Sequence, residues 1–167
     1  MLKLGRLTDY ATLVMTQLAN EPCSADAASH SATRSAHDIA QRAHLAPPTV
    51  AKLLRQLARA GLVEAERGAY GGYRLARAAA QITVADIVTA IEGPVALTEC
   101  ATAHSRCSIQ QRCGVRGSWR LINAAIEQAL QAVTLQQMAD SERLLFVRLR
   151  PATTPVVRAG TPPAATP

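Results

Sequence analysis

Residues 47–76, PPTVAKLLRQLARAGLVEAERGAYGGYRLA, contain the pattern that decides the predicted fold. Pro47 and Pro48 suit the first turn of a helix, where a missing N–H costs little, and Gly61 suits the position just beyond a helix end. The apolar stripe of this helix consists of Val50, Leu53, Leu54 and Leu57. A glycine-rich turn then separates two short strand-like stretches, at 62–66 and 73–75. The sequence therefore predicts a helix followed at once by a two-stranded ribbon.

Further helices are predicted on both sides of this unit. Residues 8–20 carry apolar side chains at helical spacing, and Ser35 with Asp38 forms a capping-box pattern before a short helix that ends at Ala43. A turn at 44–46 follows, and beyond the ribbon Thr83 begins a helix that ends at Gly93-Pro94. This order predicts a winged helix-turn-helix, a mainly α fold with a small β-wing. Aromatic residues make up only 3% of the chain, so the predicted core is aliphatic.

The same unit has the charge expected of a DNA-binding surface. A helix fits the major groove, and a glycine-rich β-turn can reach the neighbouring backbone or minor groove. The net charge is +6, and residues 30–80 hold eight Lys or Arg and three acidic residues. An amphipathic helix with a solvated basic face beside an unrelated hairpin is the alternative, but the order and spacing favour double-stranded DNA as the partner. The candidate contacts are Thr49, Lys52, Arg55, Arg59, Arg67 and Arg74.

Three of the four cysteines lie in the stretch CATAHSRCSIQQRC, residues 100–113. Their spacing, Cys-x6-Cys-x5-Cys, differs from the paired CxxC of common zinc sites. Longer spacers suit a loop around a larger object, and iron–sulfur clusters take thiolate ligands. Structural zinc, a thiol–disulfide switch and cysteines without a ligand role remain alternatives. A fourth ligand would come from His104 or from elsewhere in a dimer.

The C-terminal third is predicted to contain a long helix and a disordered tail. Ser118 is expected to cap a helix over 118–133, in which Ile122, Ile126, Ala129 and Val133 form a seam at near-heptad spacing. Five prolines fall in 151–167, where little can be buried. The expected divisions are a DNA-binding domain over 1–95, a cluster-binding loop over 96–117, a dimerisation helix over 118–140 and a C-terminal segment over 141–167. Without a long apolar run, a cytoplasmic protein with no membrane span is expected.

Several motifs together resemble one family of bacterial regulators. They are LTDYA at 7–11, LRQLARAGLVEAERGAYGGYRLA at 54–76, TVADIVTAIEG at 83–93, and three cysteines followed by Trp119. The chain resembles the IscR/NsrR-type regulators of the Rrf-two family, winged-helix repressors that carry an iron–sulfur cluster. The resemblance covers residues 1 to about 140 and is closest to the branch that regulates the SUF operon for iron–sulfur assembly.

The resemblance implies a homodimer paired through helix 118–133, with a [2Fe-2S] cluster held by Cys100, Cys107 and Cys113. Some relatives use a His three residues after the last cysteine, but Arg116 stands there in this chain, and arginine does not ligate a metal. Another branch uses an Asp from the first helix of the partner chain. Asp9 matches that residue and is preferred as the fourth ligand, ahead of His104. A helix-capping carboxylate is the alternative for Asp9.

The resemblance also assigns residues of the DNA-binding unit. Arg67 matches the family's wing arginine, and Tyr73 matches its wing tyrosine. Ala51 stands where relatives that switch between two classes of DNA site carry an acidic residue, so no such switch is expected here.

The expected function is a transcriptional regulator, a repressor that senses iron–sulfur cluster status and controls SUF assembly genes. A nitric-oxide-responsive or redox-responsive repressor of stress genes on the same fold is the first alternative. A cluster carrier or redox protein is the alternative from another class. No catalytic pair stands out in the sequence, so no enzyme activity is expected.

Overall fold

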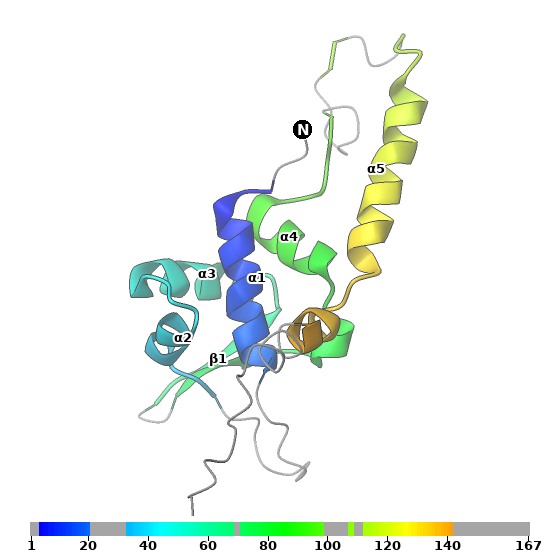
Figure 1. Cartoon of the computed structure of the whole chain (residues 1–167). Helices are drawn as coiled ribbons and strands as arrows, with labels where there is room; N and C mark the ends of the chain where they lie inside the picture. Colours follow the sequence, from blue (N-terminus) through cyan, green and yellow to red (C-terminus); the bar gives the residue numbers. More distant parts are fainter. Residues whose placement is uncertain (1–3, 21–32, 69–70, 99–106, 109–111, 142–167) are drawn as a thin grey trace, which may run out of the picture.

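The computed structural model describes residues 4–20, 33–68, 71–98, 107–108 and 112–141. It is mainly helical with one small antiparallel sheet, which confirms the predicted fold class (Figure 1). The elements in chain order are α1 (Arg6–Ala19), α2 (Ala36–Arg42), α3 (Pro47–Arg59), β1 (Val63–Glu66), β2 (Gly72–Leu75), the 3-10 helix η1 (Ala79–Gln81), α4 (Val84–Glu92) and α5 (Arg116–Gln131), followed by a helical stretch over 135–141.

One aliphatic core joins α1 to α4, the wing and the helical stretch after α5. In Figure 1, α1 stands in the centre, with α2 and α3 on one side and α4 and α5 on the other. The four apolar residues predicted for the stripe of α3 are all fully buried, which confirms the helical period read from the sequence. The other large contributors are Val14, Met15, Ile39, Leu62, Ile82, Ile87 and Leu135.

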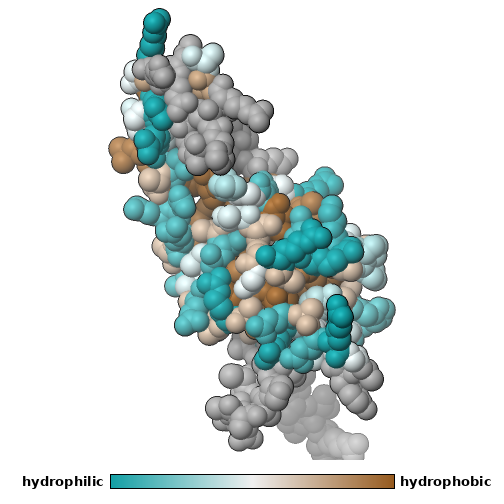
Figure 2. All heavy atoms as spheres, turned by 180° about the vertical axis from the view of Figure 1, so that it is seen from behind, coloured by the Kyte–Doolittle hydropathy of each residue, from teal (hydrophilic) through white to brown (hydrophobic). Residues whose placement is uncertain are grey.

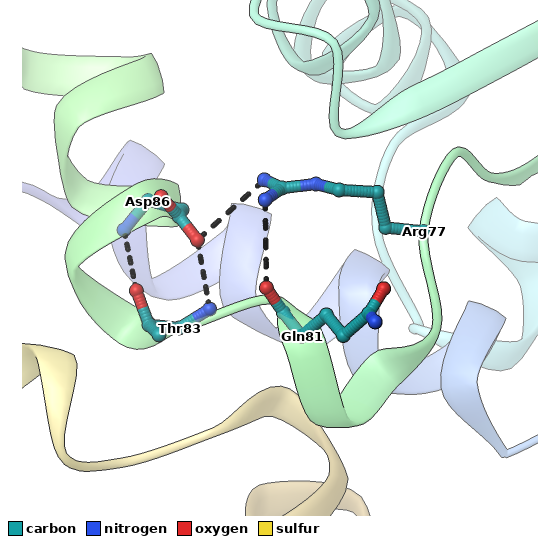
Figure 3. A network of polar contacts seen from close by, with 4 residues as sticks. All are labelled: Arg77, Gln81, Thr83 and Asp86. Carbon is teal, nitrogen blue, oxygen red and sulfur yellow. Dashed lines mark hydrogen bonds and ion pairs between the residues drawn. The ribbon is translucent and has the colours of Figure 1, made fainter.

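Local capping signals set the starts of two helices as predicted. The Ser35 hydroxyl accepts a hydrogen bond from the Asp38 N–H (3.1 Å) at the start of α2. At α4 the capping box is complete, because the Asp86 N–H donates to the Thr83 hydroxyl (3.2 Å) and the Thr83 N–H donates to the Asp86 carboxylate (2.9 Å). Arg77 extends this group by an ion pair with Asp86 (3.6 Å) and a bond to the Gln81 carbonyl (Figure 3). The start of α4 is therefore tied to the segment that leaves the wing.

The wing is held to α2 by a backbone contact that the sequence did not predict. β1 and β2 pair in register from Val63 opposite Leu75 to Glu66 opposite Gly72. On the other edge of β2, the Arg34 N–H donates to the Tyr73 carbonyl (3.0 Å), and the Tyr73 N–H donates to the Arg34 carbonyl (2.8 Å). The sheet is thus extended by one residue, Arg34, which directly precedes the N-cap of α2.

The long C-terminal helix differs from the prediction at both ends. α5 begins at Arg116 after the N-cap Val115, so Ser118 lies inside its first turn and does not cap it. The helix ends at Gln131, which places Val133 outside it, and a second helix begins at 135. The prediction of a continuous helix over 118–133, or on to 140, was therefore wrong. The expected loop at 21–35 falls largely outside the described residues, and the tail at 151–167 falls entirely outside them.

Thr134 and Gln137 explain the break after α5. The Thr134 N–H donates to the Gln137 side chain (2.9 Å), and the Gln137 N–H donates to the Thr134 hydroxyl (3.3 Å). This reciprocal pair is a capping box that starts a new helix. The new helix buries Leu135 and Ala139, so the chain returns to the core after α5. Within the described part of the chain, no helix is long and apolar enough to cross a bilayer.

Candidate DNA interface and cysteine segment

The exposed face of α3 carries the cations that the sequence predicted for DNA contact. Lys52, Arg55 and Arg59 are exposed, and Thr49 near the start of the helix is half-buried. The Arg55 Nε atom donates to the Ala51 carbonyl (3.2 Å), so the root of that side chain lies along its own helix. Because the opposite face is buried in the core, α3 presents a positively charged surface outward.

The turn between α2 and α3 is short and has a left-handed residue. His44 has φ of 52°, a left-handed conformation that is uncommon outside glycine. Its N–H donates to the Gln41 carbonyl (3.2 Å), and the Leu45 N–H donates to the Ala40 carbonyl (3.0 Å). These bonds satisfy carbonyl groups at the end of α2, so the helix-turn-helix is closed by a tight and well-bonded turn.

The three predicted wing residues have different surroundings. Arg67 is exposed just beyond β1, whereas Tyr73 is half-buried and packs against the core. Arg74 forms two ion pairs across the ribbon, from Nη2 to Glu64 (2.7 Å) and from Nε to Glu66 (3.2 Å). The charge of Arg74 is therefore largely balanced by its own wing.

A second pair of cations, which the sequence analysis missed, lies at α2. The pKa of Arg34 is lowered, first by burial and next by the nearby charge of Arg42, while Asp38 acts in the opposite direction. Arg42 is exposed in the last turn of α2. Arg34 is half-buried, so Arg42 is the more exposed of the two charges. Only the excess of basic residues over 30–80 hinted at them.

The structure describes part of the predicted ligand set. Cys107 and Cys113 are both half-buried and form no disulfide with each other, whereas Cys100 and His104 lie outside the described residues. Among the described side chains, no group of three His, Cys, Asp or Glu is placed to hold a metal ion. Arg116, which follows Cys113 by three residues, has a buried Nε atom with no hydrogen-bond partner in the described part. The binding of a cluster by Cys100, Cys107 and Cys113, with Asp9 or His104, therefore stays a prediction.

Asp9 is exposed in the first turn of α1 and does not cap that helix, so its alternative role as a capping carboxylate is wrong. The start of α1 is bonded instead by Glu92, at the end of α4. The Gly5 N–H donates to the Glu92 carboxylate (2.6 Å), and the Thr8 hydroxyl donates to the same oxygen. These two bonds lower the pKa of Glu92, the Thr8 bond most, although burial acts in the opposite direction. The contact fixes the turn that presents Asp9.

The surface of α5 is unusually apolar for an exposed helix. Leu121 is 73% exposed, Ile122 43% and Trp119 38%. Figure 2 shows a few apolar side chains among mostly hydrophilic ones on the column that α5 forms beside the body of the molecule. An exposed apolar surface of this kind is typical of an interaction site.

The fold agrees with comparisons to known proteins. The model of the Rrf2 family, described as an iron-dependent transcriptional regulator, matches residues 4–141. The chain belongs to the Rrf2 family. The transcriptional regulator IscR of Erwinia tasmaniensis is 31% identical to this Rrf2 chain over 110 residues, which is 66% of each chain.

Two solved structures are similar over most of the chain. CymR, the global cysteine regulator of B. subtilis, covers 84% of this Rrf2 chain and 98% of its own, with 29% identity and a TM-score of 0.63. IscR of T. potens covers 84% of this chain and 88% of its own, with 29% identity and a TM-score of 0.59. This member of the Rrf2 family is therefore a DNA-binding transcriptional regulator and not an enzyme.

Proposed function

We propose that this Rrf2 regulator is a cytoplasmic homodimeric repressor that senses iron–sulfur cluster status and controls SUF assembly genes. The observation that carries the proposal is the position of the cysteine segment. It joins the end of the DNA-binding unit to α5, since α4 ends at Glu92 and α5 begins at Arg116. An iron–sulfur cluster bound there would lie at the connection between the DNA-binding unit and α5.

DNA reading is assigned to α3 and the wing. Thr49, Lys52, Arg55 and Arg59 would meet the major groove and its phosphates, and Arg67 with Tyr73 would meet the neighbouring backbone. Arg74 is assigned to holding the wing strands together, because its two ion pairs with Glu64 and Glu66 already balance its charge.

The cysteine segment suits a thiolate-bound centre. Cys107 and Cys113 are half-buried thiols outside any disulfide of the described residues, which is the donor chemistry that an iron–sulfur cluster needs. Cys100 would be the third ligand and Asp9 of a second copy the fourth, with His104 next in preference. A [2Fe-2S] cluster, when bound, would provide a group that responds to redox conditions and to the supply of clusters. Its ligands would then be held in one arrangement that the apo protein lacks.

A second copy of the chain is the proposed cover for the exposed face of α5. Trp119, Leu121 and Ile122 would otherwise present apolar surface to water. A dimer paired through α5 would place two α3 helices for two half-sites about one helical turn apart. Small changes at α5 would then change the fit of both helices to DNA.

The test is anaerobic purification followed by absorption spectroscopy and footprinting on the upstream region of the chain's own gene. We expect a coloured protein with iron and sulfide, and different operator affinity for the holo and apo forms. A colourless protein that retains one zinc per chain would contradict the proposal. If nitric oxide released the operator while iron starvation had little effect, the signal would be nitric oxide or redox stress instead. Cluster transfer to acceptors without promoter binding would identify a carrier.

A further inference from the structure

The polar face of the wing carries two carboxylates and one guanidinium. Glu64 lies opposite Arg74 in the register of β1 and β2, and Glu66 lies two residues further along β1. Because side chains alternate between the two faces of a strand and opposed residues share a face, these three side chains lie on one face of the wing. The opposed pair of Val63 and Leu75 lies on the other face, where Val63 is buried and Leu75 packs against the core. The charged face therefore points away from the core.

Arg74 contacts both carboxylates at once. Its Nη2 atom lies 2.7 Å from Glu64 and its Nε atom lies 3.2 Å from Glu66. The second contact is one of charge, because the Nε atom has no hydrogen-bond partner among the described residues. The backbone beside Arg74 is fixed from the other edge of β2, where Tyr73 exchanges two hydrogen bonds with Arg34. Since Arg74 is the only Lys or Arg in β1 and β2, the charged face has one net negative charge.

The sign of this face is opposite to that of the basic surface of α3, which packs against β1. Arg67 follows Glu66 directly, and Glu64 lies three residues before Arg67. Three residues of extended chain span about 10 Å. That distance is comparable with the Debye length of about 8 Å at physiological salt, so a phosphate held by Arg67 would be repelled by both carboxylates.

The two ion pairs matter more for charge than for stability. Exposed ion pairs contribute little to stability, because water screens them, and between 32% and 51% of each of these side chains is exposed. An arginine that reaches a DNA phosphate, by contrast, adds about 0.9 to the log–log slope of affinity against salt, which is about eightfold in affinity between 1 M and 0.1 M salt. Replacing both carboxylates with neutral amides would make Arg74 available for such a contact.

We propose that Glu64 and Glu66 are specificity-determining residues, which hold Arg74 away from DNA phosphates and so limit sequence-independent binding by the wing. In a nonspecific complex no base contact fixes the protein, so a released guanidinium can adjust until it reaches a phosphate. In a specific complex the base contacts of α3 fix the register, and the same guanidinium gains less. The proposal rests on the proposed function only in that α3 and Arg67 meet DNA, and it is independent of any cluster.

The experiment measures the DNA affinity of the whole chain, without added iron or sulfide, over a range of salt concentrations. One duplex has an arbitrary sequence, and the other is selected from a random pool by the parent protein. Glu64→Gln together with Glu66→Gln should raise affinity for the arbitrary duplex about eightfold at about 0.1 M salt and steepen its slope by about 0.9. The gain on the selected duplex should be at most about twofold. A slope equal to that of the parent protein, or an equal gain on both duplexes, would overturn the proposal.

Arg74→Gln identifies the cation that is released. Added to the double variant, it should return the slope to the parent value, whereas a retained gain would show a general effect of net charge and contradict the proposal. In the parent chain, Arg74→Gln should leave the slope unchanged, because no phosphate contact is lost. A slope flatter by about 0.9 would show that Arg74 already contacts DNA, which the proposal does not allow.

Two controls accompany these variants. Asp140→Asn removes an exposed carboxylate from the helical stretch after α5 and should change neither affinity nor slope. If the double variant does not fold, as judged by circular dichroism, Glu64→Gln alone is used, because Glu64 makes the shorter contact with Arg74. A smaller increase in slope is then expected, and an unchanged slope in this folded variant would count against the proposal.

Arg67→Gln separates this proposal from the proposed DNA contact of the wing. It should flatten the slope by about 0.9. If neither Arg67→Gln nor the double variant changes the slope, the wing does not contact DNA, and the role proposed for Arg67 fails as well. If Arg67→Gln flattens the slope while the double variant behaves like the parent protein, the role of Glu64 and Glu66 fails alone.

Discussion

Gly72→Ala should loosen the wing because a methyl group at this position has no space. A Cβ atom there would lie 2.5 Å from the carbonyl oxygen of Arg34, 2.6 Å from its carbonyl carbon and 2.9 Å from its nitrogen. All three are backbone atoms, so no flexible side chain can move aside. Gly72 does not have a positive φ, and the effect is therefore steric overlap without backbone strain.

The expected loss of stability follows from what must move. Displacing Arg34 weakens its two backbone bonds with Tyr73, each worth about 0.5–1.5 kcal/mol net. Overpacking a close contact typically costs about 1–3 kcal/mol. Since these two effects describe partly the same displacement, we expect a total loss of about 2–4 kcal/mol. For a chain of this length, that loss lowers Tm by about 5–15 °C.

Thermal unfolding of the apo protein, followed by circular dichroism, measures this loss. Gly117→Ala is the matched control, because a Cβ at Gly117 meets nothing within 4 Å and the residue lies in the first turn of α5. The control should be neutral or slightly more stable, since alanine favours helix. If Gly72→Ala unfolded within 2 °C of the parent chain, the contact between Arg34 and β2 would not hold the wing as described.

Three further predictions follow. Lys52→Ala and Arg55→Ala should each weaken DNA binding and flatten its salt dependence by about 0.9 in log–log slope per lost phosphate contact, and an unchanged slope in both would argue against α3 as the reading helix. Cys107→Ala should abolish cluster absorbance and leave the dimer intact in analytical ultracentrifugation, whereas a monomeric variant would show that the dimer depends on the cysteine segment. Glu92→Gln should lower Tm at neutral pH and reduce its fall on acidification. The pKa of Glu92 is held below its ordinary 4.5, so its stabilising effect is present above 4.5 and is lost as the pH falls further; equal pH profiles of Tm in the two proteins would refute this role.

Local signals predicted most of the DNA-binding unit. Pro47, Gly61, Ser35 and Thr83 act within one helical turn, and the apolar stripe of α3 repeats at the helical period, so each could be read from neighbouring residues. The end of α5 was also readable, because Thr134 and Gln137 form a capping box. The heptad spacing of Ile122, Ile126, Ala129 and Val133 suggested continuity instead, and the stronger local signal prevailed.

The amino-acid sequence by itself determined the order of the helices, the hairpin and the basic surface, because propensity, capping and periodicity act between residues close together in the chain. Only the tertiary structure decided that Arg34 would close the edge of the wing, that Glu92 would bond the start of α1 across 87 residues, and that Asn123 would bond the backbone at Leu97. Such contacts join residues far apart in the chain, and they leave no periodic trace because each depends on one side chain or backbone group meeting another once the core has formed.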